Sequence, residues 1–263
     1  MPRLRPFAAL VSLGAVLSAG SPLVASAQDA PRTGREVLDR MHAAYSGRWY
    51  RTLTFVQRTT ITKKDGGTEV QTWHESLRAT PDGGTRLRID FGDLALGNGV
   101  IYTADSVYVV RGGKVVAQRP DGNPFLPLIE GVYVQPVERT VRDLAGTKVD
   151  LNTVSSGVWH GRPSWIVGAV ATDSSAPQFW VDRERLVLVR MILAVAPGQP
   201  MMDIDLGGYA KVGQGWLATK IAMSVGGKPA QAEEYSDWKV GMDLSPALFE
   251  AASWSTAPHW AKP

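Results

Sequence analysis

Few residues in this chain have the types and spacing that metal binding or redox chemistry requires. No two of its histidines stand at i, i+2 or i, i+4, so no local metal-binding pair is present. The chain of 263 residues has no cysteine, which excludes a thiolate metal site, a disulfide framework and a lipid-modified N-terminal cysteine. We therefore expect no metal site and no cofactor. The histidines are His42, His74, His160 and His259.

Two aspartates form the pair that most resembles a catalytic site. Asp203 and Asp205 are two residues apart, which puts both carboxyl groups on one face of a strand. The structural interpretation, the water-facing side of a half-buried strand, is favoured because charged residues are mostly exposed. His160 stands in a predicted hairpin turn, and Asp173-Ser174-Ser175 has no histidine assigned to it. We expect the chain not to be an enzyme; a hydrolase that uses Asp203, Asp205 or His160 is the least favoured alternative.

One glycine-rich motif resembles a dinucleotide-binding fingerprint. Gly213-Gln214-Gly215-Trp216-Leu217-Ala218 fits the pattern G-x-G-x-x-A, which must open a helix to hold a pyrophosphate. Residues 216–225 instead alternate as a strand does, so these glycines predict a hairpin turn. No G-x-S-x-G, H-E-x-x-H or P-loop motif occurs.

The N-terminus has the three parts of a secretory signal peptide. Arg3 and Arg5 precede an apolar run over residues 7–17, and Ala25-Ser26-Ala27 supplies the small residues of a cleavage site. The run is shorter than the roughly 20 residues of a membrane-spanning helix. We expect residues 1–27 to be removed and the mature protein, from Gln28, to be periplasmic or otherwise secreted, soluble and without a membrane span.

The charge of the mature chain is nearly balanced. Two of the 28 basic residues leave with the signal peptide, so 26 remain against 25 acidic residues. A nucleic-acid-binding domain normally carries an excess of basic residues on one face. We expect no nucleic-acid partner.

The mature chain opens with one amphipathic helix and continues as strands. Thr33-Gly34-Arg35-Glu36 fits a capping box, apolar residues recur along one face up to Tyr45, and Gly47 ends the helix. Short Gly-, Asp- and Pro-bearing turns separate about a dozen strands, so consecutive strands should pair as antiparallel hairpins. That number is more than an open sheet usually carries without curling. The predicted strands are 49–62, 68–80, 85–91, 100–103, 106–111, 114–119, 149–159, 164–171, 178–181, 186–194, 201–212, 216–225 and 231–240.

Residues 120–146 interrupt the strands. Asn123-Pro124 begins a short apolar segment, and Pro136 precedes a second apolar pattern that ends at Gly146. Two short helices in this place cannot join the sheet, but they can cover one of its faces. We predict a mainly β (α+β) fold that is one domain over residues 28–263.

The segment "QFWVDRERLVLVRMILAV", residues 178–195, contains a strand that is apolar on both faces. A strand with one face in water should alternate apolar and polar residues, whereas residues 186–195 are almost entirely apolar. Either another element covers the second face, or that face lines a cavity.

Several of these segments resemble the LolA-like family of periplasmic lipoprotein carriers, which has LolB-type and RseB-type relatives. "LTFVQRTT" is similar to the family's F-x-Q strand, and "TADSVYVVRGGKVVAQ" is similar to its "SDGKTLWFY…Q" segment, with Asp105 in the matching place. "GNPFLPLIEG" resembles the "NTPFxLI" start of the family's lid helices, and "MDLSPALFEAASW" resembles its closing segment. The order of elements is also similar, over nearly the whole mature chain.

The resemblance implies an incomplete β-barrel, in which a strongly curved antiparallel sheet has an apolar concave face covered by the first helix and by lid helices at about 124–145. It implies a carrier or sensor that binds a lipid, a lipoprotein acyl group or another apolar ligand there, with a lipid or acylated lipoprotein and envelope proteins as partners. In LolA an arginine before a turn proline helps to hold the lid; here Thr80 precedes Pro81, so Arg78, on the same face as Thr80, is the lid-holding candidate. The candidates that line the cavity are Leu87, Ile89, Phe91, Phe125, Leu128, Ile129, Met202, Ile204, Leu206 and Met223.

The alternative to a carrier is a non-catalytic envelope module, structural or protein-binding, whose curved sheet is filled by its own side chains. An unfilled apolar cavity would favour the carrier.

Overall fold

The structure, a computed structural model, describes residues 30–80, 84–120, 122–194, 196 and 198–261. The residues from Pro31 onward form one compact unit. The predicted signal peptide and its cleavage site lie outside the described residues. No helix in the described part of the chain is both long enough and apolar enough to cross a membrane.

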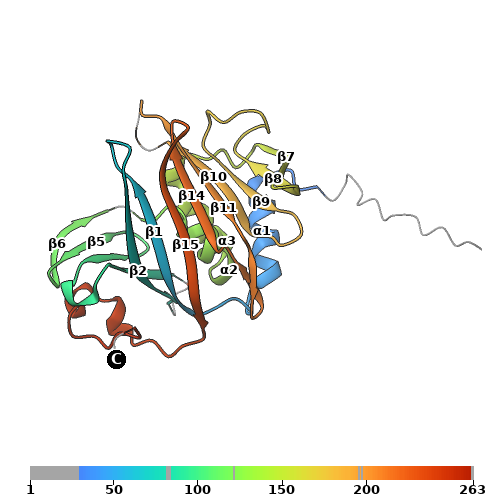
Figure 1. The fold of residues 1–263 in the computed structure, drawn as a ribbon. Helices are drawn as coiled ribbons and strands as arrows, with labels where there is room; N and C mark the ends of the chain where they lie inside the picture. Colours follow the sequence, from blue (N-terminus) through green and yellow to red (C-terminus); the bar gives the residue numbers. More distant parts are fainter. Residues whose placement is uncertain (1–29, 81–83, 121, 195, 197, 262–263) are drawn as a thin grey trace, which may run out of the picture. The chain divides into compact units, whose positions relative to one another are not determined.

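Thirteen of the described strands pair into one antiparallel sheet (Figure 1). Its order is β6-β5-β4-β3-β2-β1-β15-β14-β11-β10-β9-β8-β7, so the six strands β1–β6 and seven later strands join where β1 pairs with β15. β6 and β7 are its two edges, so the sheet is open, and the predicted mainly β class with a curved antiparallel sheet is confirmed. The strands are β1 (Thr52–Thr62), β2 (Thr68–Ala79), β3 (Thr85–Phe91), β4 (Gly99–Tyr102), β5 (Val107–Arg111), β6 (Lys114–Arg119), β7 (Val154–Trp159), β8 (Arg162–Val167), β9 (Gln178–Asp182), β10 (Leu188–Ala194), β11 (Met201–Gly207), β12 (Ala210–Val212), β13 (Gly215–Leu217), β14 (Lys220–Val225) and β15 (Lys228–Val240).

Two of the predicted strands are each divided in the structure. Residues 201–212 form β11 and β12, and residues 216–225 form β13 and β14. The division follows from Gly208, whose φ of 62° turns the chain away from the sheet. β12 and β13 pair with each other in a separate hairpin, with Gly213 in its turn at a φ of 53°. The prediction of a hairpin turn at this glycine motif is therefore confirmed.

The first helix, α1 (Gly34–Tyr45), begins and ends at the residues predicted to cap it. The Thr33 hydroxyl accepts a hydrogen bond from the Glu36 main-chain N–H at 3.2 Å. Glu36 does not close the capping box on Thr33; its carboxylate accepts instead from the N–H of Arg32 at 2.7 Å. Gly47 follows the helix with a left-handed φ of 73°. The apolar side of α1 is buried in the main core.

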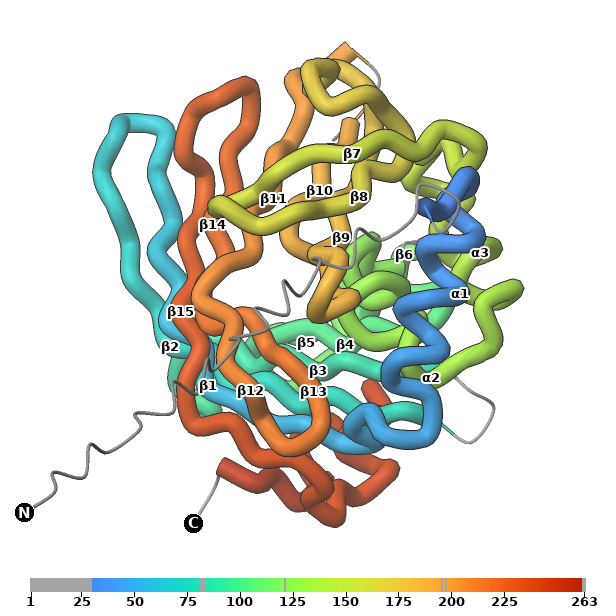
Figure 2. Tube along the Cα trace, turned by 90° about the vertical axis from the view of Figure 1, so that its right-hand side faces the viewer, coloured from blue at the N-terminus to red at the C-terminus, as the bar shows by residue number. Residues whose placement is uncertain are grey.

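A lid, residues 124–145, lies between β6 and β7 in the chain. It contains a π-helix (Pro127–Gly131), α2 (Val132–Val134) and α3 (Val137–Leu144), with Pro136 as the N-cap of α3. Figure 2 shows α1, α2 and α3 on the same side of the sheet, where the strands curve around them. The lid and α1 together cover the concave face, as the resemblance to the LolA-like family implies.

The strand that is apolar on both faces, β10, is covered on both. On the concave side Met191 and Leu193 belong to the main core with the helices. On the other side the guanidinium group of Arg190 lies over the rings of Trp159 and Trp180, at 4.2 and 5.2 Å from their centroids. Trp159 comes from β7, so the end of the sheet supplies part of the cover for its own outer face.

The C-terminal segment, residues 241–261, covers the outer face of β2 and β3. Arg88 is bidentate to Asp90 at 2.7 and 2.8 Å and lies 3.7 Å from the ring centroid of Trp254. His259 Nε2 is 3.1 Å from the same aspartate. The close approach of the Trp254 ring to the sheet needs a glycine on β4, because a Cβ at Gly99 would lie 2.6 Å from that ring. This charged face of β3 is therefore buried, although its alternation with apolar residues is typical of a solvated face.

Candidate ligand cavity

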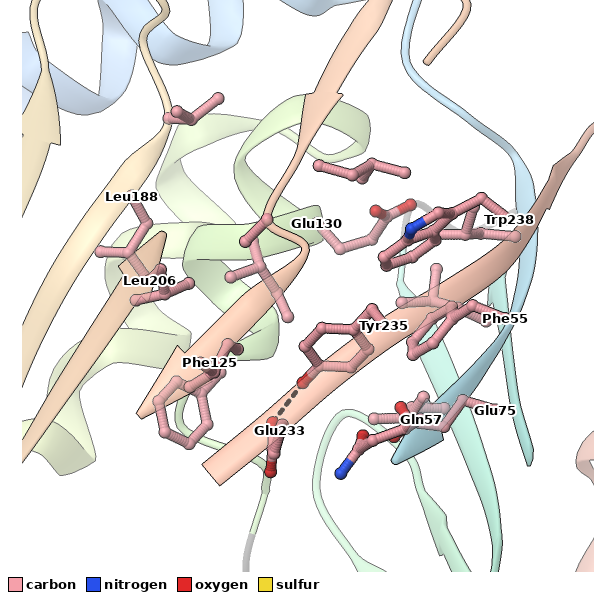
Figure 3. Close-up of a pocket in the computed structure, with 18 of the residues that line it drawn as sticks. Phe55, Gln57, Glu75, Phe125, Glu130, Leu188, Leu206, Glu233, Tyr235 and Trp238 are labelled. Atoms are coloured by element: carbon pink, nitrogen blue, oxygen red, sulfur yellow. Dashed lines mark hydrogen bonds between the residues drawn. The ribbon is translucent and has the colours of Figure 1, made fainter. Parts of the chain in front are cut away.

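An apolar cavity of about 160 Å³ lies between the concave face of the sheet and the lid (Figure 3). The sheet contributes the inward-facing side chains of β1, β2, β3, β14 and β15, and the lid contributes Phe125, Ile129, Glu130 and Tyr133. The volume is close to that of a cavity that holds benzene, roughly 150 Å³. The side chains of the fold therefore leave room for a small apolar group.

The lid places one carboxyl group in the wall of this cavity. Glu130 is 1 % exposed, and its Oε2 accepts a hydrogen bond from the indole N–H of Trp49 at 2.6 Å. Its Oε1 has no hydrogen-bond partner among the described residues, and neither has the indole nitrogen of Trp238, which lines the same cavity. Burial raises the pKa of Glu130 to about 8, against the opposing effect of the Trp49 hydrogen bond.

The sheet places two further carboxyl groups in the cavity. Glu75 on β2 is 5 % exposed, and Glu233 on β15 is 6 % exposed. Glu233 accepts hydrogen bonds from the Tyr235 hydroxyl, shown dashed in Figure 3, and from the Gln231 amide. Burial raises the pKa of Glu233, although these hydrogen bonds and that from Gln57 oppose the rise.

The charged form of Glu75 is stabilised by fewer hydrogen bonds than that of Glu233. Burial, and after it the nearby charge of Glu233, raise the pKa of Glu75 well above its ordinary value, and no hydrogen bond lowers it. The two glutamates come from strands that flank β1, where Gln57 is paired with Trp73 of β2 and with Tyr235 of β15. A polar patch thus crosses three strands at the floor of an otherwise apolar cavity.

Three solved structures match this fold over most of the chain. A domain described as that of an outer membrane lipoprotein-sorting protein, from Vibrio parahaemolyticus, has a TM-score of 0.60 and 11% identity over 84% of this chain and 97% of its own. A DUF1329 family protein from Desulfovibrio piger has a TM-score of 0.56 and 14% identity over 82% and 95%. A LolA superfamily protein from Nitrosomonas europaea has a TM-score of 0.51 and 10% identity over 82% and 97%.

The fold is LolA-like. No family model and no curated protein matches the sequence. The resemblance first drawn from short segments is thus supported at the level of the fold.

In this LolA-like fold, six of the ten side chains predicted to line the cavity do so. The other four are placed elsewhere for separate reasons. Leu128 and Ile204 are fully buried in the main core, Met202 lines a different groove on the far side of the lid, and Phe91 packs on the Trp73 ring at 4.6 Å from its centroid, outside the cavity. The six that line the cavity are Leu87, Ile89, Phe125, Ile129, Leu206 and Met223.

Arg78 does not reach the lid. It lies on the outer face of β2, where its Nη1 donates to the main-chain oxygen of Leu244 at 2.7 Å, because strand alternation puts it opposite the inward-facing Leu77. The arginine that lies near Thr80 and Gly84 is instead Arg139, on helix α3 of the lid. A Cβ built on Gly84 would lie 2.8 Å from Arg139 Nη2 and 2.8 Å from Thr80 Oγ1. The Arg139 guanidinium group of the lid and the Thr80 hydroxyl therefore both lie close to Gly84.

The residues considered for hydrolysis lie on the outer face of the sheet. Asp203 is bidentate to Arg190 at 2.6 and 2.9 Å. Asp205 accepts from the Trp159 indole at 2.8 Å and is 2.8 Å from His160 Nε2. Both carboxylates therefore have side-chain partners on the outer face, Asp203 on the neighbouring strand β10 and Asp205 at the β7–β8 hairpin. Among the described residues, no group of three His, Asp or Glu side chains could hold a metal ion.

The predictions from sequence did not include the polar residues of the cavity. Trp73, Glu75 and Leu77 alternate on β2, so the strand pattern itself puts the glutamate on the apolar face. The sequence signal for a polar group in the cavity is therefore a charged residue on a strand with apolar neighbours at i−2 and i+2.

Proposed function

We propose that this protein is a soluble extracytoplasmic carrier or sensor that binds a lipid, a lipoprotein acyl group or another apolar ligand in the cavity under the lid. The observation that carries the proposal is the cavity of about 160 Å³, which the side chains of sheet and lid leave unfilled. A module with a filled core would have no such space. The binding of an apolar group needs shape and the exclusion of water, and no catalytic residue.

The size of the cavity determines what it can hold with the lid in place. Comparison with the roughly 150 Å³ of a benzene-binding cavity gives room for about six carbon atoms. Burial of six methylene groups contributes about 5 kcal/mol before the costs of association. A full acyl chain is longer, so this space holds only part of it.

The proposed location rests on the N-terminal sequence. Residues 1–27 have the order of charged, apolar and small residues that directs a chain to secretion. One structure with this fold is described as a lipoprotein-sorting domain, which favours acylated proteins and envelope proteins as partners here. The proposed role is non-catalytic. Asp203 is held by Arg190 on the outer face, and Asp205 has Trp159 and His160 as partners there, outside the cavity.

The experiment that tests this function is recovery of the native ligand. Protein purified from the envelope should give a native mass spectrum with a bound apolar molecule, and the emptied protein should bind a fluorescent fatty-acid analogue. Ile129→Asp, in the cavity wall, should abolish that binding, whereas Val170→Asp, on an exposed side chain outside the cavity, should not. Protein that is always empty and binds no analogue would support the structural module instead.

A further inference from the structure

The cavity has acidic groups and no basic ones. Among the described residues that line it are the three glutamates Glu75, Glu130 and Glu233, and none that is Lys, Arg or His. An anionic head group, such as a fatty-acid carboxylate or a phosphate, would therefore meet carboxyl groups without a compensating cation. An anion buried without a compensating positive charge is strongly unfavourable.

Two of these glutamates lack the partners that buried carboxyl groups normally have. Glu130 is 1 % exposed, and its Oε1 has no partner among the described residues. Glu75 is 5 % exposed, faces the cavity, and has no hydrogen bond that stabilises its charged form. Buried polar groups are nearly always satisfied, so these carboxyl groups indicate that a donor belongs in the cavity.

The rest of the wall favours an organic cation as that donor. Nine of the lining side chains are aromatic, and ring faces attract ammonium groups through their quadrupoles. A metal ion is a weaker fit, since no three acidic or imidazole groups in the described part of the chain are close enough to share one. The aromatic lining side chains are Trp49, Phe55, Trp73, Phe125, Tyr133, Tyr209, Trp216, Tyr235 and Trp238.

We propose, building on the proposed role in binding apolar ligands, that the cavity selects a ligand in which an ammonium-type cation is attached to an apolar chain. The apolar chain lies against the leucine, isoleucine and methionine side chains of the wall. The cation lies at the floor of the cavity, where its charge favours the ionised form of Glu75. Gln57 and Glu233 provide further oxygen acceptors there. Figure 3 shows these acceptors on β1, β2 and β15 at one side of the cavity, while Leu188 of β10 and Leu206 of β11 lie across it.

A matched series of six-carbon ligands tests this selection. Hexylammonium, hexan-1-ol and hexanoate have the same chain and differ in the charge of the head group. Titration calorimetry of the emptied full-length mature protein should show hexylammonium binding roughly tenfold or more tightly than hexan-1-ol, because a charge-assisted hydrogen bond replaces a neutral one. Hexanoate should bind most weakly.

Substitution of Glu75 should remove the preference and keep the cavity. In Glu75→Gln the ratio of the two affinities should fall to about one, with hexan-1-ol binding unchanged within roughly twofold, since the apolar wall is intact. Retained binding of hexan-1-ol also shows that this variant folds. Glu130→Gln, a second variant, should lower the ratio as well. The control is Glu69→Gln on the same strand, because Glu69 is exposed and lies 3.3 Å from Lys63.

The outcomes separate this proposal from the proposed function. Equal binding of the three hexyl ligands, or a ratio that survives both Glu75→Gln and Glu130→Gln, would overturn the cation selectivity and leave an apolar carrier. A failure of all three ligands and of the fluorescent fatty-acid analogue to bind would overturn the carrier and, with it, the selectivity.

Discussion

Replacement of Glu130 by Gln tests whether the cavity wall holds a carboxyl group that resists ionisation. The side chain is 1 % exposed, one oxygen accepts from Trp49, and the other has no partner among the described residues. Gln keeps an oxygen for the Trp49 hydrogen bond and cannot ionise. The variant therefore changes the titration of the site with little change in its shape.

The magnitude follows from the pKa of Glu130 in the folded protein, which burial raises from 4.5 to about 8. Because the folded state keeps a proton that the unfolded chain has already released, the contribution of this group to stability is complete below about pH 4.5 and is lost as pH rises through about 8. The difference between the two pKa values corresponds to at most about 5 kcal/mol. Between pH 5 and pH 8.5, we expect the wild-type protein to lose about 2–4 kcal/mol relative to Glu130→Gln.

Urea denaturation of both proteins at pH 5 and pH 8.5 measures this difference. Glu75 and Glu233, whose pKa values are also raised by burial, are present in both proteins, so their titration cancels in the comparison. Glu234→Gln is the control, because Glu234 is exposed on β15 and paired with Arg58 at 3.2 Å. If the difference in unfolding free energy between Glu130→Gln and the wild type is the same at both pH values, the reasoning about this carboxyl group is refuted.

Three further predictions concern the lid, the outer face and processing. Leu128→Asp should lower the unfolding free energy, measured in urea, by about 3–5 kcal/mol, because Leu128 is fully buried in the core. Ile129→Asp should chiefly abolish binding of a fatty-acid analogue. Equal loss of stability in both variants would contradict the assignment of Leu128 to the core and of Ile129 to the cavity wall. Gly99→Ala should cost about 1–3 kcal/mol and change the fluorescence of Trp254, since its Cβ would clash with the main-chain oxygen of Ile89 and lie 2.6 Å from the Trp254 ring. Unchanged stability would contradict these close approaches. Mature protein should begin at Gln28 by mass spectrometry, and an intact N-terminus would contradict signal cleavage.

The elements that local chemistry determines could be predicted from the sequence. The N-cap at Thr33 and the left-handed stop at Gly47 fix the ends of α1 by contacts within a few residues. The boundary between β11 and β12 differs from the prediction of one strand over residues 201–212, because Gly208 adopts a positive φ between them. Glycine inside a strand pattern often marks such a break, so the local signal for the separate β12–β13 hairpin is present in the sequence.

The charged face of β3 shows what sequence patterns leave out. Arg88 and Asp90 alternate with apolar residues as a solvated face does, yet both are buried under the C-terminal segment. Their partners, Trp254 and His259, are more than 160 residues away in the chain. No local pattern encodes a contact of that separation, so the same sequence is consistent with an exposed strand and with a covered one.

The apolar side chains of the cavity could be predicted from the sequence, whereas its carboxyl groups could not, for a physical reason. Apolar side chains such as Leu87 and Ile89 are placed by strand alternation, which selects the buried face without reference to any ligand. Leucine at position 75 would fit the same face and avoid the cost of burying a carboxyl group. Glu75 therefore lowers the stability of the empty fold, and a ligand that supplies a donor to it restores part of that loss. A positive group bound at this position should stabilise the folded protein, by an amount that rises with the logarithm of its affinity, which links the unpaired carboxyl group directly to the choice of ligand.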